Sequence, residues 1–305
     1  MFLMHISIRA SDTEGAPAVP AGRARRAGTL VWLARHDRVS AAAMGFLLAL
    51  VLLSLVGPPV TRYAYDREDL DALFQPPSAG HWLGTDQFGR DLLTRVLYGA
   101  RVSLSVGASA VIGESLLGIT WGTVAGFYGG VVDHVLMRIV DLLIAFPTIL
   151  LAILVTGIFG PSLVNIVIAL VLTAWPAMAR TIRSEVVSIR EREYVEGARA
   201  LGASVPRILL RHVVPNVVHL LIVRATLDAS FLVLAEATLS FIGIGVQPPR
   251  PSWGQMIYES FQYLGSHPWL VVIPATGLSL TVISFNLVGE ALAALLDPRY
   301  RRGRT

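Results

Sequence analysis

Lysine and cysteine are both absent from this 305-residue chain, and all 25 of its Lys-plus-Arg positions are arginine. Without lysine the chain has no Walker A loop to hold nucleotide phosphates and no amine for a Schiff base. Without cysteine it has no disulfide, no thiolate nucleophile and no Cys-ligated zinc. The His-Glu-x-x-His and Gly-x-Ser-x-Gly motifs are missing as well. We therefore predict no catalytic residue, no metal site and no resident cofactor.

Charged residues are also few, at 15% of the chain, whereas hydrophobic residues make up 54% and the mean hydropathy is +0.62. A soluble domain of this length is far less apolar. About 20 apolar residues in a helix cross a bilayer core that is about 30 Å thick. We predict an all-α, polytopic membrane protein with six transmembrane helices, at residues 40–60, 102–125, 139–158, 163–179, 213–236 and 270–296.

The arginines are distributed unevenly between the two sides of the predicted membrane. If the N-terminus is cytosolic, 18 of the 25 arginines lie in cytosolic segments, six lie in outer segments and Arg224 lies inside a span. Because positive residues accumulate in cytosolic loops, this orientation is predicted and the reverse is rejected. The excess of arginine over acidic residues is then explained by the orientation of the chain in the membrane, with a contribution from attraction to anionic lipid. Nucleic acid is therefore not an expected partner.

These spans divide the chain into segments. Residues 1–39 are predicted to form a cytosolic tail, too long and irregular for a signal peptide, before the first transmembrane helix at 40–60. The remaining segments are an extracytoplasmic segment at 61–100, a helical core at 101–297 that holds a cytosolic loop at 180–215, and a basic C-terminal tail at 298–305.

Residues 180–215 form a charge-dense stretch between two long apolar runs. Residues 190–201 favour a short helix, with an apolar stripe at Tyr194, Val195, Ala198 and Leu201. Gly202 is a typical helix stop, and Ser204 is placed to cap a second helix with Pro206 in its first turn. An ordered charged segment in such an apolar chain indicates a surface for a soluble partner.

Within this stretch Glu196, Gly197 and Ala198 are followed at fixed spacing by Gly202 and Pro215. The spacing resembles the E-A-A-x3-G-x9-I-x-L-P loop of binding-protein-dependent ABC importer permeases, with glycine in place of the first alanine and two substitutions before the proline. In that family the loop is the coupling helix, which docks on the ATPase. The alternative is an amphipathic helix at the membrane surface. The coupling residues implied are Tyr194, Val195, Glu196, Gly197, Ala198, Leu201, Gly202 and Pro215.

Four further blocks resemble the C-type permease subunit of the dipeptide, oligopeptide and nickel importers. They are HWLGTDQFGRD at 81–91, GFYGGVVDHVLMRIVDLLIAFP at 126–147, ATLSFIGIGVQPPRPSWG at 237–254 and FNLVGEALAALLDPR at 285–299. The resemblance implies the type I importer permease (MetI-like) fold. It also implies a bacterial inner-membrane location, with both termini cytosolic, and a passive gate that a partner drives by hydrolysing ATP.

The same resemblance implies a set of partners. They are a homologous B-type permease subunit, two ABC ATPase subunits that bind ATP and Mg²⁺, an extracytoplasmic substrate-binding protein and membrane lipid. Di- or oligopeptide is the expected cargo, and the alternatives are nickel, glutathione or another small solute.

Polar residues inside the predicted spans are candidates for the translocation path, because a charge in lipid is costly unless it is paired or hydrated. Arg224 and Asp228 are one turn apart and are expected to pair. The full set is Glu114, Arg224, Asp228, Glu236, Asn286 and Glu290. The same carboxylates leave two other functions open. A proton-coupled secondary transporter would use them to carry protons, but it leaves the charged stretch at 180–215 unexplained. An intramembrane enzyme would use them in catalysis, but the sequence lacks a catalytic motif.

The outer segments contribute a second set of candidates, Asp86, Arg90, Asp91, Gln247 and Trp253. We expect these residues either to contact the substrate or the binding protein, or only to order the loops in which they lie. Asp86 is expected to accept from backbone amides, and Arg90 to pair with Asp86 or Asp91. An irregular turn is predicted at 243–251 from its glycines and prolines.

Two patterns concern packing. One helix face carries three glycines four residues apart, which favours a close helix–helix approach: Gly118, Gly122 and Gly126. Arg138 lies within helical reach of Asp133 and Asp141, so a charge-balanced helix start is expected there, or a contact with the ATPase.

Overall fold

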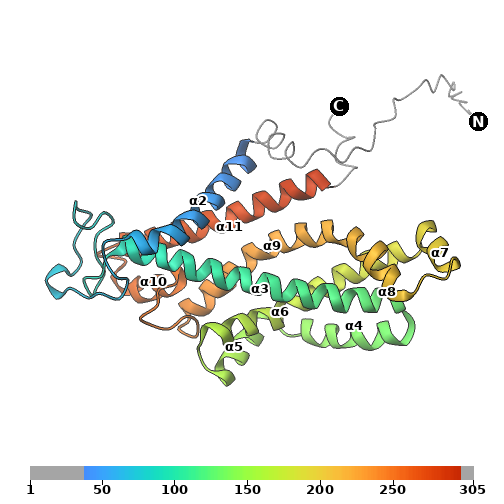
Figure 1. The fold of residues 1–305 in the computed structure, drawn as a ribbon. Helices are drawn as coiled ribbons and strands as arrows, with labels where there is room; N and C mark the ends of the chain where they lie inside the picture. The colour runs from blue at the N-terminus through green and yellow to red at the C-terminus, as the bar shows by residue number, and fades with distance from the viewer. Residues whose placement is uncertain (1–37, 297–305) are drawn as a thin grey trace, which may run out of the picture.

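The structure, a computed structural model, describes residues 38–296, so most of the predicted N-terminal tail and the whole C-terminal tail lie outside the described residues. Within 38–296 every regular element is helical, which confirms the all-α prediction (Figure 1). The long helices are α2 (Arg38–Val60), α3 (Leu92–Tyr128), α6 (Leu163–Arg190), α9 (Val214–Phe241) and α11 (Trp269–Leu296). The short ones are η1 (Leu70–Ala72), α4 (Gly130–Ile144), α5 (Thr148–Phe159), α7 (Glu193–Ala200), α8 (Val205–Ile208), η2 (Leu209–Val213), α10 (Trp253–Ser260) and η3 (Phe261–Tyr263).

Five helical segments of the described chain are long and apolar enough to cross a membrane: α2, α3, α6, the continuous segment Val205–Phe241, and α11. A sixth span exists only if α4 and α5 count together, and these two helices are bent by 86° at their junction. The predicted span at 139–158 is therefore not one continuous helix: residues 139–144 end α4 and residues 148–158 lie in α5. Pro147 at the break explains the bend, because proline has no N–H to continue the helical hydrogen bonding.

Two predicted boundaries also shift. α3 begins at Leu92, inside the predicted outer segment, because the Asp91 carboxylate accepts a hydrogen bond from the Thr94 amide at 2.8 Å and caps the helix there. α6 continues to Arg190 instead of stopping at residue 179. The first third of the charge-dense stretch is therefore a continuation of a membrane-spanning helix.

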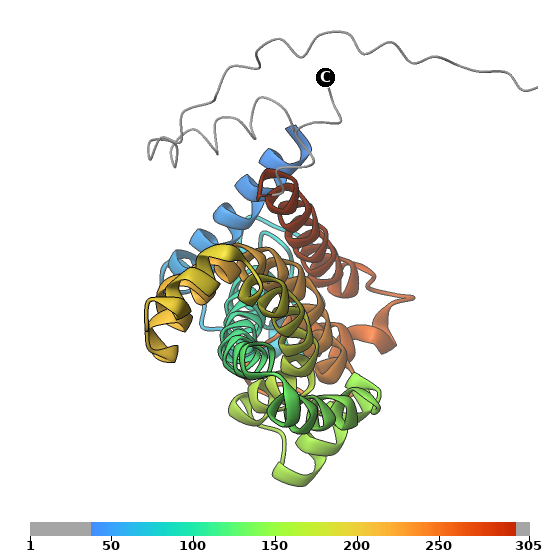
Figure 2. The same ribbon diagram turned by 90° about the vertical axis from the view of Figure 1, so that its right-hand side faces the viewer.

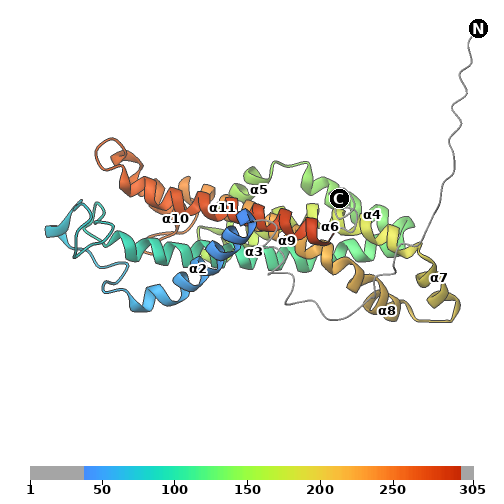
Figure 3. The same ribbon diagram turned by 90° about the horizontal axis from the view of Figure 1, so that it is seen from above.

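The long helices form an elongated bundle. Seen along its axis, α3, α6 and α9 occupy the centre, with α2 and α11 on one side and α4 and α5 on the other (Figure 2). One end of the bundle, the α10 end, carries α10 and the segment 61–91 (Figure 1). The opposite end, the α7 end, carries α7 and α8, which extend beyond the neighbouring ends of α3 and α6 (Figures 1 and 3).

Helices α3 and α6 are held unusually close by glycine. A Cβ atom added at Gly122 would lie 2.5 Å from the carbonyl oxygen of Ala179, and one at Gly126 would lie 2.8 Å from that of Arg183. Both distances are too short for a real contact, so only glycine lets the two backbones pack here. The predicted close approach is confirmed, and α6 is the partner helix.

Candidate functional site

The α7 end contains the predicted coupling loop, and α7 is attached to the bundle mainly through Val195. This side chain is fully buried with Ile189, Ile208 and Val213 in one apolar cluster that joins α6, α7, α8 and η2. Gly202 follows α7 with a φ of +78°, a left-handed conformation that glycine adopts without strain. The predicted stop at Gly202 is confirmed, and the turn places α8 directly after α7.

The predicted apolar stripe does not lie on one buried face. Val195 is buried and Ala198 is half-buried, whereas Tyr194 is 42% exposed and Leu201 is 89% exposed. The stripe is thus divided between an anchor that packs on the bundle and two large apolar side chains that face outward. The other residues of the predicted set are also exposed: Glu196, Gly197 and Pro215.

Two local details differ from the prediction. Ser204 occupies the N-cap position of α8, but its side chain makes no capping hydrogen bond, so the predicted capping by its hydroxyl is wrong. Between α8 and α9 the chain forms a π-helical turn at Leu209–Val213, just before Pro215. The Asn216 side-chain amide donates to the His212 carbonyl at 2.6 Å and satisfies one carbonyl of this turn.

Close to this end, ion pairs join α4 to α6. Asp133 is paired with Arg183, and Asp141 accepts from Arg180 at 2.6 Å. The predicted pairing of Arg138 with either aspartate is wrong: Arg138 has no ion pair among residues 38–296. Helical spacing placed Arg138 within reach, but the arginines of the neighbouring helix α6 reach the two carboxylates instead.

The interior candidates fall into separate environments. Arg224 donates from Nε to Asp228 Oδ2 at 2.8 Å, so the predicted pair is confirmed. Glu114 is buried within electrostatic reach of this pair, yet both of its carboxylate oxygens lack a hydrogen-bond partner in the described part of the chain. Asn286 accepts from Ser230 at 3.1 Å, and Glu290 is exposed near the end of α11.

Glu236 is the most enclosed acidic side chain of the interior set. It is fully buried and accepts hydrogen bonds from the hydroxyls of Ser103 on α3 and Ser240 on α9, both at 2.8 Å. The Ser240 hydroxyl also accepts from the Val246 amide. Glu236 therefore ties α3 to α9 and to the turn that follows α9.

At the α10 end, Asp86 accepts from the backbone amides of Phe88 and Arg90, as predicted, and pairs with the Arg90 Nε at 2.7 Å. Arg90 and Arg95 both donate to Glu259, at 3.0 and 3.1 Å. Asp91 is bonded to His81, at 2.9 Å, and to Thr94. The predicted outer candidates Asp86, Arg90 and Asp91 are thus buried or nearly so and hold the segment together.

The predicted irregular turn after α9 is confirmed, since residues 243–252 are not helical and Gly243 has a φ of +87°. Gln247 lies on its exposed surface and donates to the carbonyls of Gly243 and Gly245. Trp253 is 1% exposed, and its indole N–H donates to the Val96 carbonyl at 3.1 Å. As an accessible contact residue Trp253 is a wrong prediction, because its ring packs in the core between α10 and α3.

Residues 118–302 match the family model described as binding-protein-dependent transport system inner membrane component. The chain belongs to this family. Among its relatives, the dipeptide transport system permease protein DppC of Alkalihalophilus pseudofirmus is 40% identical, over 88% of each chain. The oligopeptide transport system permease protein OppC of Bacillus subtilis is 36% identical, again over 88% of each chain. The glutathione transport system permease protein GsiD of Pectobacterium atrosepticum is 38% identical, over 87% of this chain and 89% of the relative.

A solved structure of the MetNI methionine ABC transporter, in an inward-facing conformation, has the same fold. Its matching chain aligns with a TM-score of 0.54 and 19% sequence identity, over 67% of this chain and 97% of that one. The predicted importer permease fold is thereby confirmed, and this family member is a multi-pass membrane protein.

Sequence reasoning missed several residues that organise this permease. Glu259 and Arg95 complete the buried ionic network, and Ser103 and Ser240 satisfy Glu236. Arg95 and Glu259 are 164 positions apart, and Ser103 and Glu236 are 133 apart. Only Ser240, one turn after Glu236, carried a local signal that could have been found from helical spacing.

Proposed function

We propose that this chain is a transmembrane permease subunit of an ATP-driven, binding-protein-dependent importer of di- or oligopeptides. Family membership supports the class of transporter, and similarity to dipeptide and oligopeptide permeases supports the cargo. In this proposal the chain forms half of the translocation path beside a homologous permease. An extracytoplasmic binding protein delivers the solute. The chain is not catalytic, and two ATPase subunits bind ATP and Mg²⁺.

The observation that carries the proposal is that the apolar residues of α7 and its C-terminal end are partly buried against the bundle and partly exposed. Val195 fixes α7 to the bundle, whereas Tyr194 and Leu201 are exposed. Helix α7 itself extends beyond the neighbouring ends of α3 and α6 (Figure 3). Leu201 is 89% exposed, and exposed apolar surface in a charged loop is typical of a site that contacts a protein partner. Movement of that partner then passes to α6 and α9 through the buried cluster around Val195.

Replacement of Leu201 tests the docking directly. Leu201→Asp is expected to abolish co-purification of the ATPase subunits with the assembled permeases and to abolish ATP-driven peptide uptake by proteoliposomes. Leu70→Asp is the matched control, because Leu70 is 74% exposed but lies in η1 at the opposite end of the bundle. Unchanged ATPase recovery with Leu201→Asp would contradict docking through α7.

A proton-coupled secondary transporter is the second candidate, and the buried Glu114 carboxylate with no hydrogen-bond partner among the described residues favours it. Vesicles that contain the permeases without ATPase subunits separate the two classes. We expect no peptide uptake when only a proton gradient is imposed, and uptake when the ATPases and ATP are restored. Uptake driven by the gradient alone would reject the ABC importer. Identification of the ligand that co-purifies with the cognate binding protein separates peptide from glutathione or nickel.

A further inference from the structure

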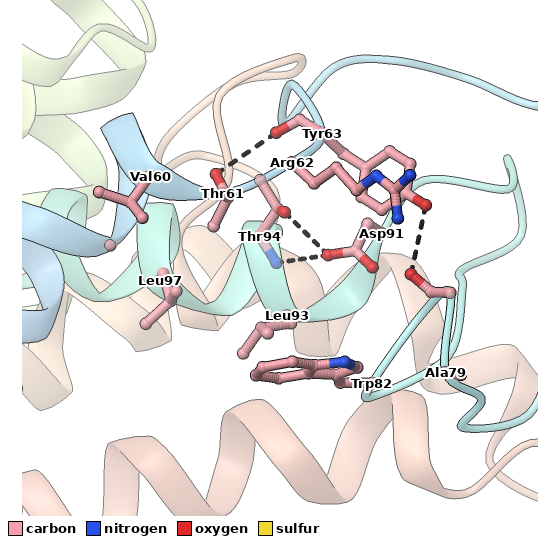
Figure 4. Close-up of a pocket in the computed structure, with 12 residues that line it drawn as sticks. Val60, Thr61, Arg62, Tyr63, Ala79, Trp82, Asp91, Leu93, Thr94 and Leu97 are labelled. Atoms are coloured by element: carbon pink, nitrogen blue, oxygen red, sulfur yellow. Dashed lines mark hydrogen bonds between the residues drawn. The ribbon is translucent and has the colours of Figure 1, made fainter.

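A pocket of about 450 Å³ lies at the α10 end, between the last turn of α2 and the first turns of α3 (Figure 4). Its wall is completed by the loop that carries Trp82. None of the candidate coupling or translocation-path residues lines it. The pocket is therefore separate from the proposed coupling surface and from the candidate translocation path, and it shares only Asp91 with the outer candidates.

The lining of this pocket is divided into an apolar part and a polar part. Val60 and Leu97 lie on one side of the view in Figure 4, and Arg62, Tyr63 and Asp91 lie on the other. Val60 is the last residue of an apolar helix long enough to cross a membrane, so the apolar part adjoins the hydrocarbon and the polar part adjoins the headgroups. Trp82 is 72% exposed beside them, a position typical of tryptophan at a membrane–water interface.

The lining of the pocket contains one cationic side chain, Arg62, and one acidic side chain, Asp91. The Asp91 carboxylate is already occupied by His81 and by the amide and hydroxyl of Thr94. Arg62, by contrast, has no hydrogen bond or ion pair with any residue between 38 and 296. An exposed guanidinium whose N–H groups have no partner among the described residues attracts an anion, and guanidinium binds phosphate well because its N–H groups match the phosphate oxygens.

We propose that this pocket binds a phospholipid of the membrane leaflet at the α10 end. The phosphate lies against Arg62, and the upper part of an acyl chain lies between Val60 and Leu97. A soluble anion would fill only the polar part and would leave the apolar part in contact with water, whereas a phospholipid satisfies both parts. The lipid would fix the end of α2 against α3.

The test uses the complete permease–ATPase complex in nanodiscs of phosphatidylethanolamine and phosphatidylglycerol, with a phosphatidylglycerol that carries a photoreactive diazirine near the top of its acyl chain. After illumination, lipid adducts on the pocket segments 57–60 and 93–97 are compared with adducts on residues 45–52 of α2, which report bulk lipid. We expect the pocket adducts to fall about fivefold in Arg62→Ala, the factor that one arginine near a charged membrane surface contributes.

Two variants and one competitor make the outcome decisive. Arg62→Lys keeps the positive charge but loses the planar set of N–H groups, so it is expected to retain more adducts than Arg62→Ala. Arg67→Ala is expected to retain all of them, because it removes an exposed arginine of the same outer segment that does not line the pocket. Excess inorganic phosphate is expected to have no effect. Equal pocket adducts in Arg62→Ala and Arg67→Ala would overturn the proposal. Loss of the adducts to inorganic phosphate, or protein–protein adducts at this site in place of lipid, would overturn it too.

Discussion

Arg183 on α6 forms two hydrogen bonds with the Asp133 carboxylate on α4: its Nε donates to Oδ1 at 2.7 Å and its Nη2 donates to Oδ2. Two parallel N–H···O bonds fix both distance and orientation, which a single contact does not. The pair lies beside Gly126, on the part of α6 that leads toward α7. It therefore holds α4 in place close to the surface that we propose for ATPase docking.

A double-mutant cycle tests that pair. Asp133→Asn and Arg183→Gln are each expected to lower the thermal stability of the detergent-solubilised complex, and the double variant is expected to lose less than the sum. The coupling should be about 0.5–1 kcal/mol, because the Arg183 side chain is 36% exposed and solvent weakens the interaction. Arg138→Gln is the control, since Arg138 has helical spacing to Asp133 but does not touch it. A larger effect from Arg138→Gln than from Arg183→Gln would reverse the assignment.

The Arg224–Asp228 pair inside α9 leads to a different prediction. Arg224→Ala leaves Asp228, a mostly buried carboxylate, without its partner, so uptake and assembly are both expected to fall. Removal of Asp228 as well should recover part of the loss, because the uncompensated charge is then gone. Uptake by the two single variants and the double variant checks this, and strictly additive losses would mean that the two residues do not act as a pair.

Gly202 and Gly197 form a matched pair for the coupling loop. A Cβ atom would meet nothing within 4 Å at either position, but only Gly202 has a positive φ, of +78°. Gly202→Ala is expected to strain the turn by about 1–2 kcal/mol and to reduce ATP-driven uptake while assembly with the other permease persists. Gly197→Ala should leave uptake unchanged, because alanine favours the helix that it joins. Wild-type uptake by Gly202→Ala would remove the requirement for this turn.

Gly122 tests the contact between α3 and α6. In Gly122→Ala the new methyl group would lie 2.5 Å from the Ala179 carbonyl oxygen, so the two backbones must separate. We expect the variant to lose about 1–3 kcal/mol of stability, measured as a lower midpoint of thermal unfolding. Gly45→Ala is the control, because a methyl group on Gly45 of α2 meets nothing within 4 Å. Equal midpoints for the two variants would show that α3 and α6 are not in backbone contact.

Much of this fold follows from local patterns in the sequence. Apolar length located the spans, the spacing of Gly118, Gly122 and Gly126 predicted a close helix contact, and Arg224 and Asp228 pair as their one-turn separation indicates. These features depend on residues within a turn or a few turns of one another. Such local features can be read from a single sequence.

The failures have a common cause. Asp133 could be assigned to Arg138 by helical spacing, but its real partner lies on another helix, and the identity of that partner depends on how α4 packs on α6. Trp253 is among the outer candidates from its position just after the irregular turn, yet α10 folds back and buries it against α3. The 86° bend at Pro147 likewise separates two apolar helices that hydropathy alone merges. Each error concerns how elements pack, which a local pattern does not contain.

Helix α3 runs for 37 residues, a length of about 55 Å, without a break or an internal proline. One of its ends carries Arg95, in the ionic network with Asp86 and Glu259, and the other carries Gly126, whose carbonyl accepts from Arg190 at the end of α6. A continuous helix tilts as a stiff rod. A change of angle imposed at the α7 end must therefore appear as a displacement of the ionic network at the far end, with no relay of small local changes between them.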